Sequence, residues 1–385
     1  MQISDSIKYV GVNDHEIDLF EGQFKVPDGM AYNSYLILDE KTAVMDSVDA
    51  RFGGEWLSNI GAALGGKSPD YLVVQHMEMD HSASIMRFAE AYPDARIVSS
   101  HLAFTMMRSY FGTDFADRQV VVAEGSALEL GKRVLRFIGA PNVHWPEVLL
   151  TYSAEDKVLF SADAFGKFGA NDREDAEGWA CEARRYYFGI VGKFGAQAQA
   201  VLKKAAGLDI RTIAPLHGPV LSENLQYYLD LYDTWSSYGV ESEGVAIAYT
   251  SVYGNTRQVA EKLAEILRAR GCPKVAVFDL ARSDIYECVE DAFRYGKLVL
   301  ATTTYNGGVF PAMREFIWHL TERNFQSRTV ALIENGSWAP SAAKGMAAML
   351  AQSKDITLAE TKVTVRIAMS DETVAQLERL AQELL

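Results

Sequence analysis

The sequence is poor in cysteine, in long apolar runs and in positive charge. Its three cysteines, Cys181, Cys272 and Cys288, are too few and too scattered for a disulfide framework or a cysteine-based metal site. No apolar run approaches the roughly 18–20 residues that cross a bilayer. The net charge of −14 opposes nucleic-acid binding, which needs a basic patch. These absences argue against a disulfide-stapled secreted domain, a membrane-spanning helix and a nucleic-acid-binding protein.

The start of the chain also lacks the pattern of a secretory signal. Residues Met1–Ser6 contain neither a basic region nor an apolar region. The hydrophobic fraction of 49% and the charged fraction of 23% are ordinary for a globular protein. A length of 385 residues is enough for two hydrophobic cores. We therefore expect a two-domain enzyme of the cytoplasm.

Histidine is scarce too, yet four of the seven histidines lie where a metal site is expected. The stretch His76–His81 (HMEMDH) places four potential ligands directly after the apolar run 71–74, which predicts a buried strand. These ligands are His76, Glu78, Asp80 and His81. Burying so many titratable groups without a partner would be costly. Imidazole and carboxylate without thiolate favour iron, manganese or zinc.

Three further ligand candidates occur downstream in a similar context. His144, Asp163 and His217 each follow a short apolar segment and precede a turn-forming residue. A carboxylate such as that of Asp163 has two oxygens and can hold two cations a few ångströms apart. No such context surrounds the remaining histidines, His15, His101 and His319.

The second half of the chain contains a loop suited to a phosphate group. Residues 244–249 predict a strand and 257–267 predict an amphipathic helix, with a hydroxyl-rich loop between them. Backbone N–H groups at a helix N-terminus bind anions, aided by the helix dipole. The loop lacks the glycine pattern of a dinucleotide fold and the lysine of a nucleotide triphosphatase. A monophosphate such as that of FMN fits, and the candidate residues are Ser251, Val252, Tyr253, Gly254, Asn255 and Thr256.

Two more glycine-containing loops follow the predicted strands 298–301 and 329–333. Each loop carries an aromatic residue, and glycine permits the close backbone approach that a flavin ring requires. The candidates are Thr302, Thr304, Tyr305, Asn306 and Gly307 in the first loop and Gly336, Ser337 and Trp338 in the second. Which aromatic side chain faces the flavin, Tyr305 or Trp338, stays open.

The ligand order H-x-E-x-D-H, then His, Asp and His, resembles the metallo-β-lactamase fold, whose usual H-x-H-x-D-H cluster binds zinc. Glu78 replaces the second histidine, which favours iron and is typical of the flavodiiron proteins. In that family a lactamase-like domain holds a non-haem di-iron centre. The resemblance implies one iron held by His76, Glu78 and His144, a second iron held by Asp80, His81 and His217, and Asp163 as the bridge.

Residues 244–385 resemble flavodoxin over nearly their whole length, a fold in which FMN lies beside the first and third strands. We therefore predict an α/β protein with two domains. Residues 1–243 would form a metallo-β-lactamase-like αββα sandwich with the di-iron centre. Residues 244–385 would form a flavodoxin-like, doubly wound parallel sheet that binds FMN. A polar linker at 236–244 would join the two domains.

The family resemblance implies reduction of O2 to water, of NO to N2O, or of both. It also implies a head-to-tail homodimer, or a tetramer of dimers. Paired C-x-x-C motifs of a rubredoxin module are missing, so we expect a separate electron donor, such as rubredoxin or a reduced deazaflavin.

Two alternatives remain at this point. The first is a zinc-dependent hydrolase with a regulatory flavodoxin-like domain, against which Glu78 argues. The second is an electron carrier with a degenerate first domain, against which the complete ligand set argues. The basic pairs Arg184–Arg185 and Lys203–Lys204 are possible docking points for an acidic electron carrier, and we interpret both as solvated helix faces.

Overall fold

The structure is a computed structural model that describes residues 3–175 and 177–385. The chain divides into two compact units, Met1–Asp233 and Thr234–Leu385. This division lies inside a helix, ten residues before the limit expected from the sequence at 243/244. The first two residues of the N-terminal segment, which the sequence predicts not to be a secretory signal, lie outside the described residues.

The first unit contains many short strands and several helices. Its strands are β1 (Ile7–Tyr9), β2 (Val12–Asp14), β3 (Leu19–Phe20), β4 (Phe24–Lys25), β5 (Met30–Tyr32), β6 (Tyr35–Ile37), β7 (Ala43–Met45), β8 (Tyr71–Val73), β9 (Arg96–Ser99), β10 (Gln119–Val121), β11 (Ala127–Glu129), β12 (Val134–Gly139), β13 (Leu149–Ser153), β14 (Val158–Phe160) and β15 (Thr212–Ala214). Its α-helices are α1 (Gly53–Leu64), α2 (Met79–Ser82), α3 (Ile85–Ala91), α4 (His101–Phe111), α5 (Trp179–Tyr186), α6 (Gly195–Ala205) and α7 (Leu225–Ser236). Shorter helical segments are η1 (Ala50–Phe52), the π-helical η2 (Tyr187–Val191) and η3 (Gly192–Phe194).

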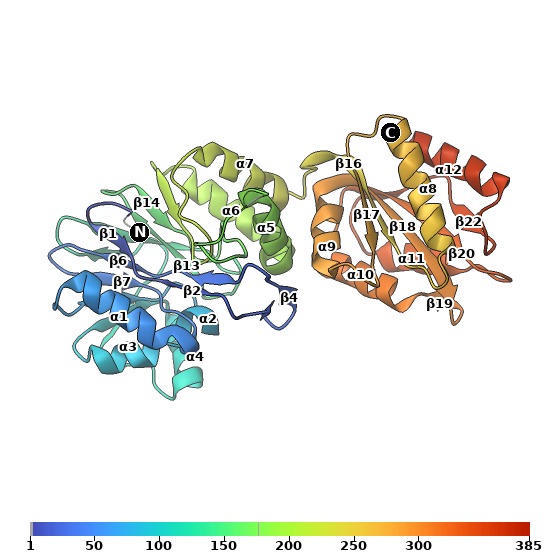
Figure 1. Cartoon of the computed structure of the whole chain (residues 1–385). Helices are drawn as coiled ribbons and strands as arrows, with labels where there is room; N and C mark the ends of the chain where they lie inside the picture. The colour runs from blue at the N-terminus through green and yellow to red at the C-terminus, as the bar shows by residue number, and fades with distance from the viewer. Residues whose placement is uncertain (1–2, 176) are drawn as a thin grey trace. The chain divides into compact units, whose positions relative to one another are not determined.

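Two sheets pack face to face in this unit. One sheet has the strand order β1-β6-β7-β8-β9-β10, and the other has the order β11-β12-β13-β14-β15. Apolar side chains from both sheets, including Met45, Val73, Phe137 and Phe160, share one buried core. Helices α1, α3 and α4 lie along one sheet and α5, α6 and α7 along the other (Figure 1). The αββα sandwich predicted from the sequence is confirmed.

The second unit alternates strands and helices. Its strands are β16 (Ser242–Tyr249), β17 (Val275–Asp279), β18 (Tyr295–Tyr305), β19 (Gly308–Val309), β20 (Arg328–Asn335), β21 (Ile356–Leu358) and β22 (Val363–Val365). Its helices are α8 (Asn255–Ala269), α9 (Ile285–Arg294), α10 (Pro311–Glu322), α11 (Ala342–Leu350) and α12 (Asp371–Glu383).

The sheet of the second unit has the order β17-β16-β18-β20-β21, with β22 also paired to β20. These pairings are parallel, and only the short β19 pairs in the antiparallel sense. Helices α8 and α12 contact each other, and α10 contacts both α9 and α11, so helices lie on both faces of the sheet (Figure 1). The doubly wound parallel sheet predicted from the sequence is confirmed, and in this fold ligands bind at the carboxyl ends of the strands.

Local sequence signals explain several boundaries. Gly254 has a φ of 92°, a backbone conformation that favours glycine, and α8 begins directly after it. Ser370 caps α12, because its side chain accepts a hydrogen bond from Thr373 N. The expectation of a solvated face at Arg184–Arg185 is wrong, because both side chains are buried and Arg185 bonds to Glu182 and Lys25 O.

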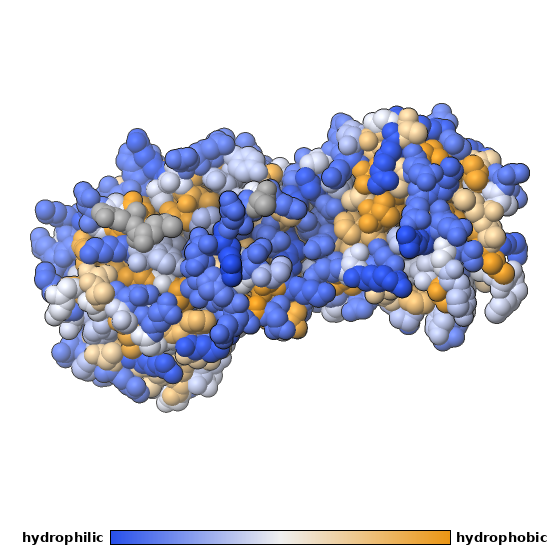
Figure 2. Space-filling view, viewed as in Figure 1, coloured by the Kyte–Doolittle hydropathy of each residue, from blue (hydrophilic) through white to orange (hydrophobic). Residues whose placement is uncertain are grey.

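The surface visible in Figure 2 is mostly hydrophilic, with scattered apolar patches. Among the described helices, none is both long and apolar enough to cross a membrane.

Candidate metal centre and flavin site

The predicted metal ligands meet in two groups at one edge of the first unit. One group contains His76, Glu78, His144 and Asp163, and the other contains Asp80, His81 and His217. Within each group the ligand atoms lie within 4.8 Å of one another. All seven side chains therefore come together, although they are spread over more than 140 residues of sequence.

Asp163 lies between the two groups. Its Oδ2 is 3.3 Å from His76 Nε2 and 3.0 Å from His144 Nε2. Its Oδ1 is 3.3 Å from His81 Nε2 and 3.8 Å from His217 Nε2. Each carboxylate oxygen thus faces one group, which is the arrangement that a ligand shared by two cations requires.

The other carboxylates serve one group each. Glu78 Oε2 is 3.3 Å from His76 Nε2 and 3.0 Å from His144 Nε2. Asp80 Oδ2 is 3.1 Å from both His81 Nε2 and His217 Nε2. The two groups therefore have a similar composition, with two imidazoles and one carboxylate each in addition to the shared Asp163.

Short loops at the ends of strands place these side chains. The single helical turn α2 follows β8 and carries Asp80 and His81, and the Ser47 hydroxyl donates to His81 O at 2.6 Å. Asp163 follows β14 in a loop where Ala162 and Phe165 have positive φ values of 49° and 65°. Such conformations are uncommon outside glycine and concentrate at functional sites.

Hydrogen bonds on the far side of the rings fix two imidazoles. His76 Nδ1 lies 2.9 Å from Glu147 Oε1, which also accepts from Met77 N at 2.9 Å. His217 Nδ1 donates to Ala31 O at 2.7 Å. Both contacts leave the Nε2 lone pair facing the site, as is usual for histidine bound to metal. Trp145 packs edge-on against His76, with ring centroids 5.3 Å apart.

The carboxylates of Glu78, Asp80 and Asp163 lie in a largely buried site, where they are stable as anions only if positive charge lies beside them. Burial alone would lower the pKa of His81, but Asp80 and Asp163 raise it to about 10. Burial opposes the shift at His144 too, yet Asp163 and Glu78 raise its pKa to about 9. Among the described residues, neither oxygen of Asp80 finds a hydrogen-bond partner, although two imidazole nitrogens lie 3.1 Å from Oδ2. Divalent cations bound to neutral imidazoles would supply the missing charge and satisfy these atoms.

One carboxyl group near the site was not expected. Glu21 lies in the turn between β3 and β4 with a positive φ of 49°; its side chain is exposed, but partial desolvation and the neighbouring charge of Glu78 raise the pKa of its carboxyl group above the usual value. Nothing in the local sequence marks Glu21, since it follows a two-residue strand far along the chain from any ligand.

The predicted flavin loops meet in a cavity of about 360 Å³ in the second unit. Its walls come from the ends of β18 and β20 and from the segments that follow β16, β20 and β22, all at the carboxyl edge of the sheet. The predicted residues that line it are Ser251, Val252, Tyr253, Asn255, Thr256, Thr304, Tyr305, Gly336, Ser337 and Trp338. Tyr253 and Trp338 are 92% and 88% exposed, so flat aromatic side chains are available at its rim.

Some predicted flavin residues lie outside the lining of this cavity, and some lining residues were missed. Gly254, Thr302, Asn306 and Gly307 are not part of the lining. Thr302 is buried, and its hydroxyl bonds to that of Thr250 instead. The missed residues are Thr303, Asn335 and Ile367. Ile367 follows a fourth strand, β22, for which we predicted no loop.

The start of α8 fits a phosphate group. This helix has 15 residues, and Gly254 at its N-cap provides no side-chain hydrogen bond. Its first N–H groups are thus not capped by the N-cap side chain, and Thr256 lies beside them in the cavity lining. Such a helix N-terminus favours an anion.

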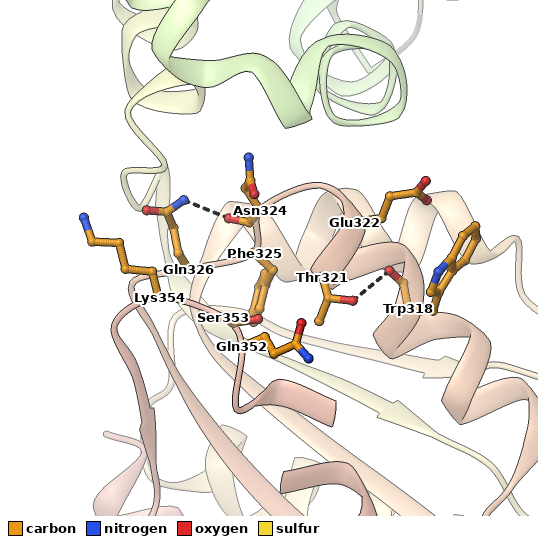
Figure 3. Close-up of a pocket in the computed structure, with 9 residues that line it drawn as sticks. All are labelled: Trp318, Thr321, Glu322, Asn324, Phe325, Gln326, Gln352, Ser353 and Lys354. Atoms are coloured by element: carbon orange, nitrogen blue, oxygen red, sulfur yellow. Dashed lines mark hydrogen bonds between the residues drawn. The ribbon is translucent and has the colours of Figure 1, made fainter. Parts of the chain in front are cut away.

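A second cavity of about 500 Å³ lies near the opposite end of β20 (Figure 3). It is lined by Trp318, Thr321, Glu322, Asn324, Phe325, Gln326, Gln352, Ser353 and Lys354. Phe325 alone in this lining is fully buried, and the described residues place no group of metal ligands there. The cavity thus lacks the buried polar side chains that mark the other two sites.

Family models match both units. Residues 30–218 match the ODP family beta lactamase, and residues 246–364 match a flavodoxin domain. Together these matches cover the metal ligands and most of the flavin loops.

Individual proteins match the whole chain. A nitric oxide reductase of Moorella thermoacetica is 29% identical over 99% of this chain and 97% of its own length. The solved structure of rubredoxin oxygen:oxidoreductase from Desulfovibrio gigas has a TM-score of 0.92 at 27% identity, over 100% of this chain and 97% of that one. A flavodiiron protein from Giardia intestinalis has a TM-score of 0.92 at 26% identity, over 99% and 96%.

Proposed function

Because the chain belongs to the flavodiiron protein family, we propose that it reduces O2 to water, NO to N2O, or both. The reaction would take place at a non-haem di-iron centre, with electrons relayed through FMN from a separate donor. The observation that carries this proposal is the position of Asp163, whose two carboxylate oxygens face two separate groups of ligands.

The proposed ligand assignment follows the two groups. His76, Glu78 and His144 would hold one iron, Asp80, His81 and His217 would hold the other, and Asp163 would contribute one carboxylate oxygen to each. Iron fits this donor set, because imidazole with hard carboxylate oxygen and no thiolate suits it. When bound, two ferrous ions and reduced flavin supply the electrons that a small diatomic substrate accepts.

The surrounding residues prepare the site for this chemistry. Glu147 and the carbonyl of Ala31 hold His76 and His217 in fixed orientations, so that little rearrangement accompanies the change of charge at the site. Trp145 covers the edge of His76 and limits the space beside it.

The flavin assignment rests on the second unit. FMN would place its phosphate at the start of α8, near Thr256, and its ring between the loops that carry Tyr305 and Trp338. We propose 1–243 as the di-iron domain and 244–385 as the FMN-binding domain, although the compact units divide ten residues earlier.

A dimer follows from the need to bring flavin and metal close together, because electron tunnelling weakens steeply with distance. We propose a head-to-tail homodimer or a tetramer of such dimers, with each flavin beside the partner's irons. Two-fold dimers are also the commonest assemblies. Light scattering combined with turnover at several dilutions tests this, and a monomer with full activity would contradict it.

The electron donor is proposed to be a separate protein such as rubredoxin, or a reduced deazaflavin. We also propose a cytoplasmic location, because three scattered cysteines do not form the disulfide framework that is typical of small secreted domains.

The decisive test of this function is anaerobic stopped-flow mixing of the fully reduced protein with O2 and, separately, with NO. About two irons and one FMN per chain, together with fast flavin reoxidation that His81→Asn abolishes, are the expected result. Slow reoxidation by both gases, with zinc in place of iron, would instead point to a metal-dependent hydrolase.

A further inference from the structure

Helix α11 begins directly after the loop that forms one wall of the flavin cavity, and its N-terminus is capped in an unusual way. Ser341, at the N-cap, makes no capping hydrogen bond with its own side chain. The N–H groups of Ser341 and Ala342 donate instead to Thr304 Oγ1, at 3.0 and 3.1 Å. The next N–H group, of Ala343, donates to Glu334 Oε2 at 3.0 Å. The caps of α11 therefore come from the ends of β18 and β20.

Glu334 is a buried carboxylate, with only 3% of its surface exposed. It lies in β20 between Thr302 of β18 and Thr364 of β22 in the strand register. Its Oε1 accepts from the Thr364 hydroxyl at 3.0 Å and pairs with Lys362 Nζ at 3.1 Å. Both carboxylate oxygens therefore have partners, and Glu334 joins β20, β22 and α11.

The ion pair itself adds little stability, because the Lys362 side chain is 56% exposed and solvent screens its charge. A carboxylate at a helix N-terminus, however, fixes where the helix begins through its charge and its hydrogen bond. This points to a requirement for a defined position of the α11 N-terminus.

The loop held by this arrangement is Gly336–Pro340. At its start, Asn335 exchanges hydrogen bonds with the backbone of Ile367, at 2.9 and 3.0 Å. At its end, Ser341 Oγ donates to Gly307 O at 3.1 Å, and Glu334 caps the helix that follows. Gly336, Ser337 and Trp338 between these anchors line the flavin cavity.

We propose that Glu334 is a positioning residue for the flavin, which caps α11 and thereby holds the loop 336–340 in the shape that receives the ring. This inference rests on the proposed FMN site. Glu334 itself is not part of the lining of the cavity, so its influence passes through the loop.

The test compares the full chain with Glu334→Ala, Glu334→Gln and the control Glu315→Ala, an exposed glutamate of α10 in the same unit. The flavin is removed, and FMN is titrated back while its fluorescence quenching is followed. Hydrogen exchange is measured over residues 336–346 in the flavin-bound protein. Glu334→Ala is expected to raise the dissociation constant for FMN about 10-fold, as the loss of a cap would, and to speed exchange in this segment.

Glu334→Gln keeps an acceptor oxygen and the shape of the side chain. This variant is therefore expected to fold and to raise the dissociation constant for FMN only about threefold. Glu315→Ala should change neither quantity. If both Glu334 variants lower the midpoint of thermal unfolding but bind FMN as tightly as the wild type, Glu334 has a merely structural role and the inference is overturned. That result would leave the proposed function intact, whereas a wild-type protein that binds no FMN would overturn both.

Discussion

The metal site and the flavin site are built on different principles, although both lie at the ends of strands. Five of the seven proposed metal ligands are buried side chains, Glu78 and Asp80 are partly buried, and further buried groups such as Glu147 hold them in place. The flavin cavity is lined by loop residues, and its aromatic side chains Tyr253 and Trp338 are largely exposed. The first site is defined by side-chain chemistry, and the second by backbone conformation and the surroundings of its loops.

This difference predicts that each site can be damaged without the other. Substitutions that alter a metal-ligand side chain should reduce metal binding without affecting FMN binding. Substitutions that alter the backbone conformation of the flavin loops should weaken FMN binding without affecting metal binding.

The largest effect is expected from removing the shared ligand. Asp163→Asn replaces one of the two anionic oxygens, so both cations lose charge compensation, and turnover should fall by more than about 100-fold. Metal analysis of the purified variant should show loss of iron with FMN content unchanged. The exposed Asp172→Asn is the matched control, and retention of both irons in Asp163→Asn would contradict the bridging role.

A smaller effect is expected at Glu147, which contacts a ligand without belonging to either ligand group. Glu147→Ala frees His76 to rotate, and loss of such a partner typically weakens metal binding by about 10- to 100-fold. Competition with a chelator measures this change. Glu147→Gln retains an acceptor oxygen, so its metal affinity should lie between that of Glu147→Ala and that of the wild type. Unchanged chelator resistance in both variants would show that Glu147 does not support metal binding.

The corresponding change in the flavin site is Gly254→Ala. A Cβ atom here would meet nothing within 4 Å, so the cost is that of φ 92° alone. We expect FMN binding to weaken about 10-fold, because the start of α8 must shift to relieve a strain of about 1 kcal/mol or more. Gly271→Ala, at the other end of the same helix with φ 86°, imposes the same strain away from the cavity and should leave FMN affinity unchanged.

The smallest effect is expected in the pH dependence of the stability of the second unit. Burial, followed by the charge of Arg323, lowers the pKa of His319 to about 4, so this imidazole is neutral in the folded second unit. The unfolded chain takes up the proton near pH 6.5, so stability is complete above this value and falls as pH drops toward 4. Unfolding of the second unit should lose about 1 to 2 kcal/mol between pH 7 and 5.

Denaturant unfolding at several pH values checks this expectation. His319→Gln should flatten the pH dependence, and the exposed His101→Gln should not. An unchanged slope in His319→Gln would show that another group causes the loss.

The same contrast explains what could be predicted from the sequence. The seven proposed metal ligands can be predicted because side chains of the required types follow strands in a recognisable order, and the structure brings all seven side chains together. Their supporting partners are less visible. Glu147 stands in the same short segment as His144, but only the fold shows that it contacts His76, 71 positions earlier.

The three loops that the sequence predicts to bind flavin do meet at one cavity, but its lining differs from the predicted residues in detail. Thr302 was chosen and Thr303 was passed over, because the alternation of side chains at the end of β18 depends on where the strand stops. Asn335 and Ile367 were missed because they belong to the ends of β20 and β22, whose pairing is a long-range feature. Buried charges such as Arg185 also escape prediction when a partner, here the backbone carbonyl of Lys25, is distant in sequence.

The carboxylate of Asp163 is proposed to bind two metal ions in the first unit. Anomalous diffraction from crystals of the iron-loaded protein, collected on both sides of the iron absorption edge, tests it most directly. We expect two iron peaks about 3.5 to 4 Å apart on either side of Asp163, one beside His144 and one beside His217. A single peak, or two peaks with the absorption edge of zinc, would contradict it.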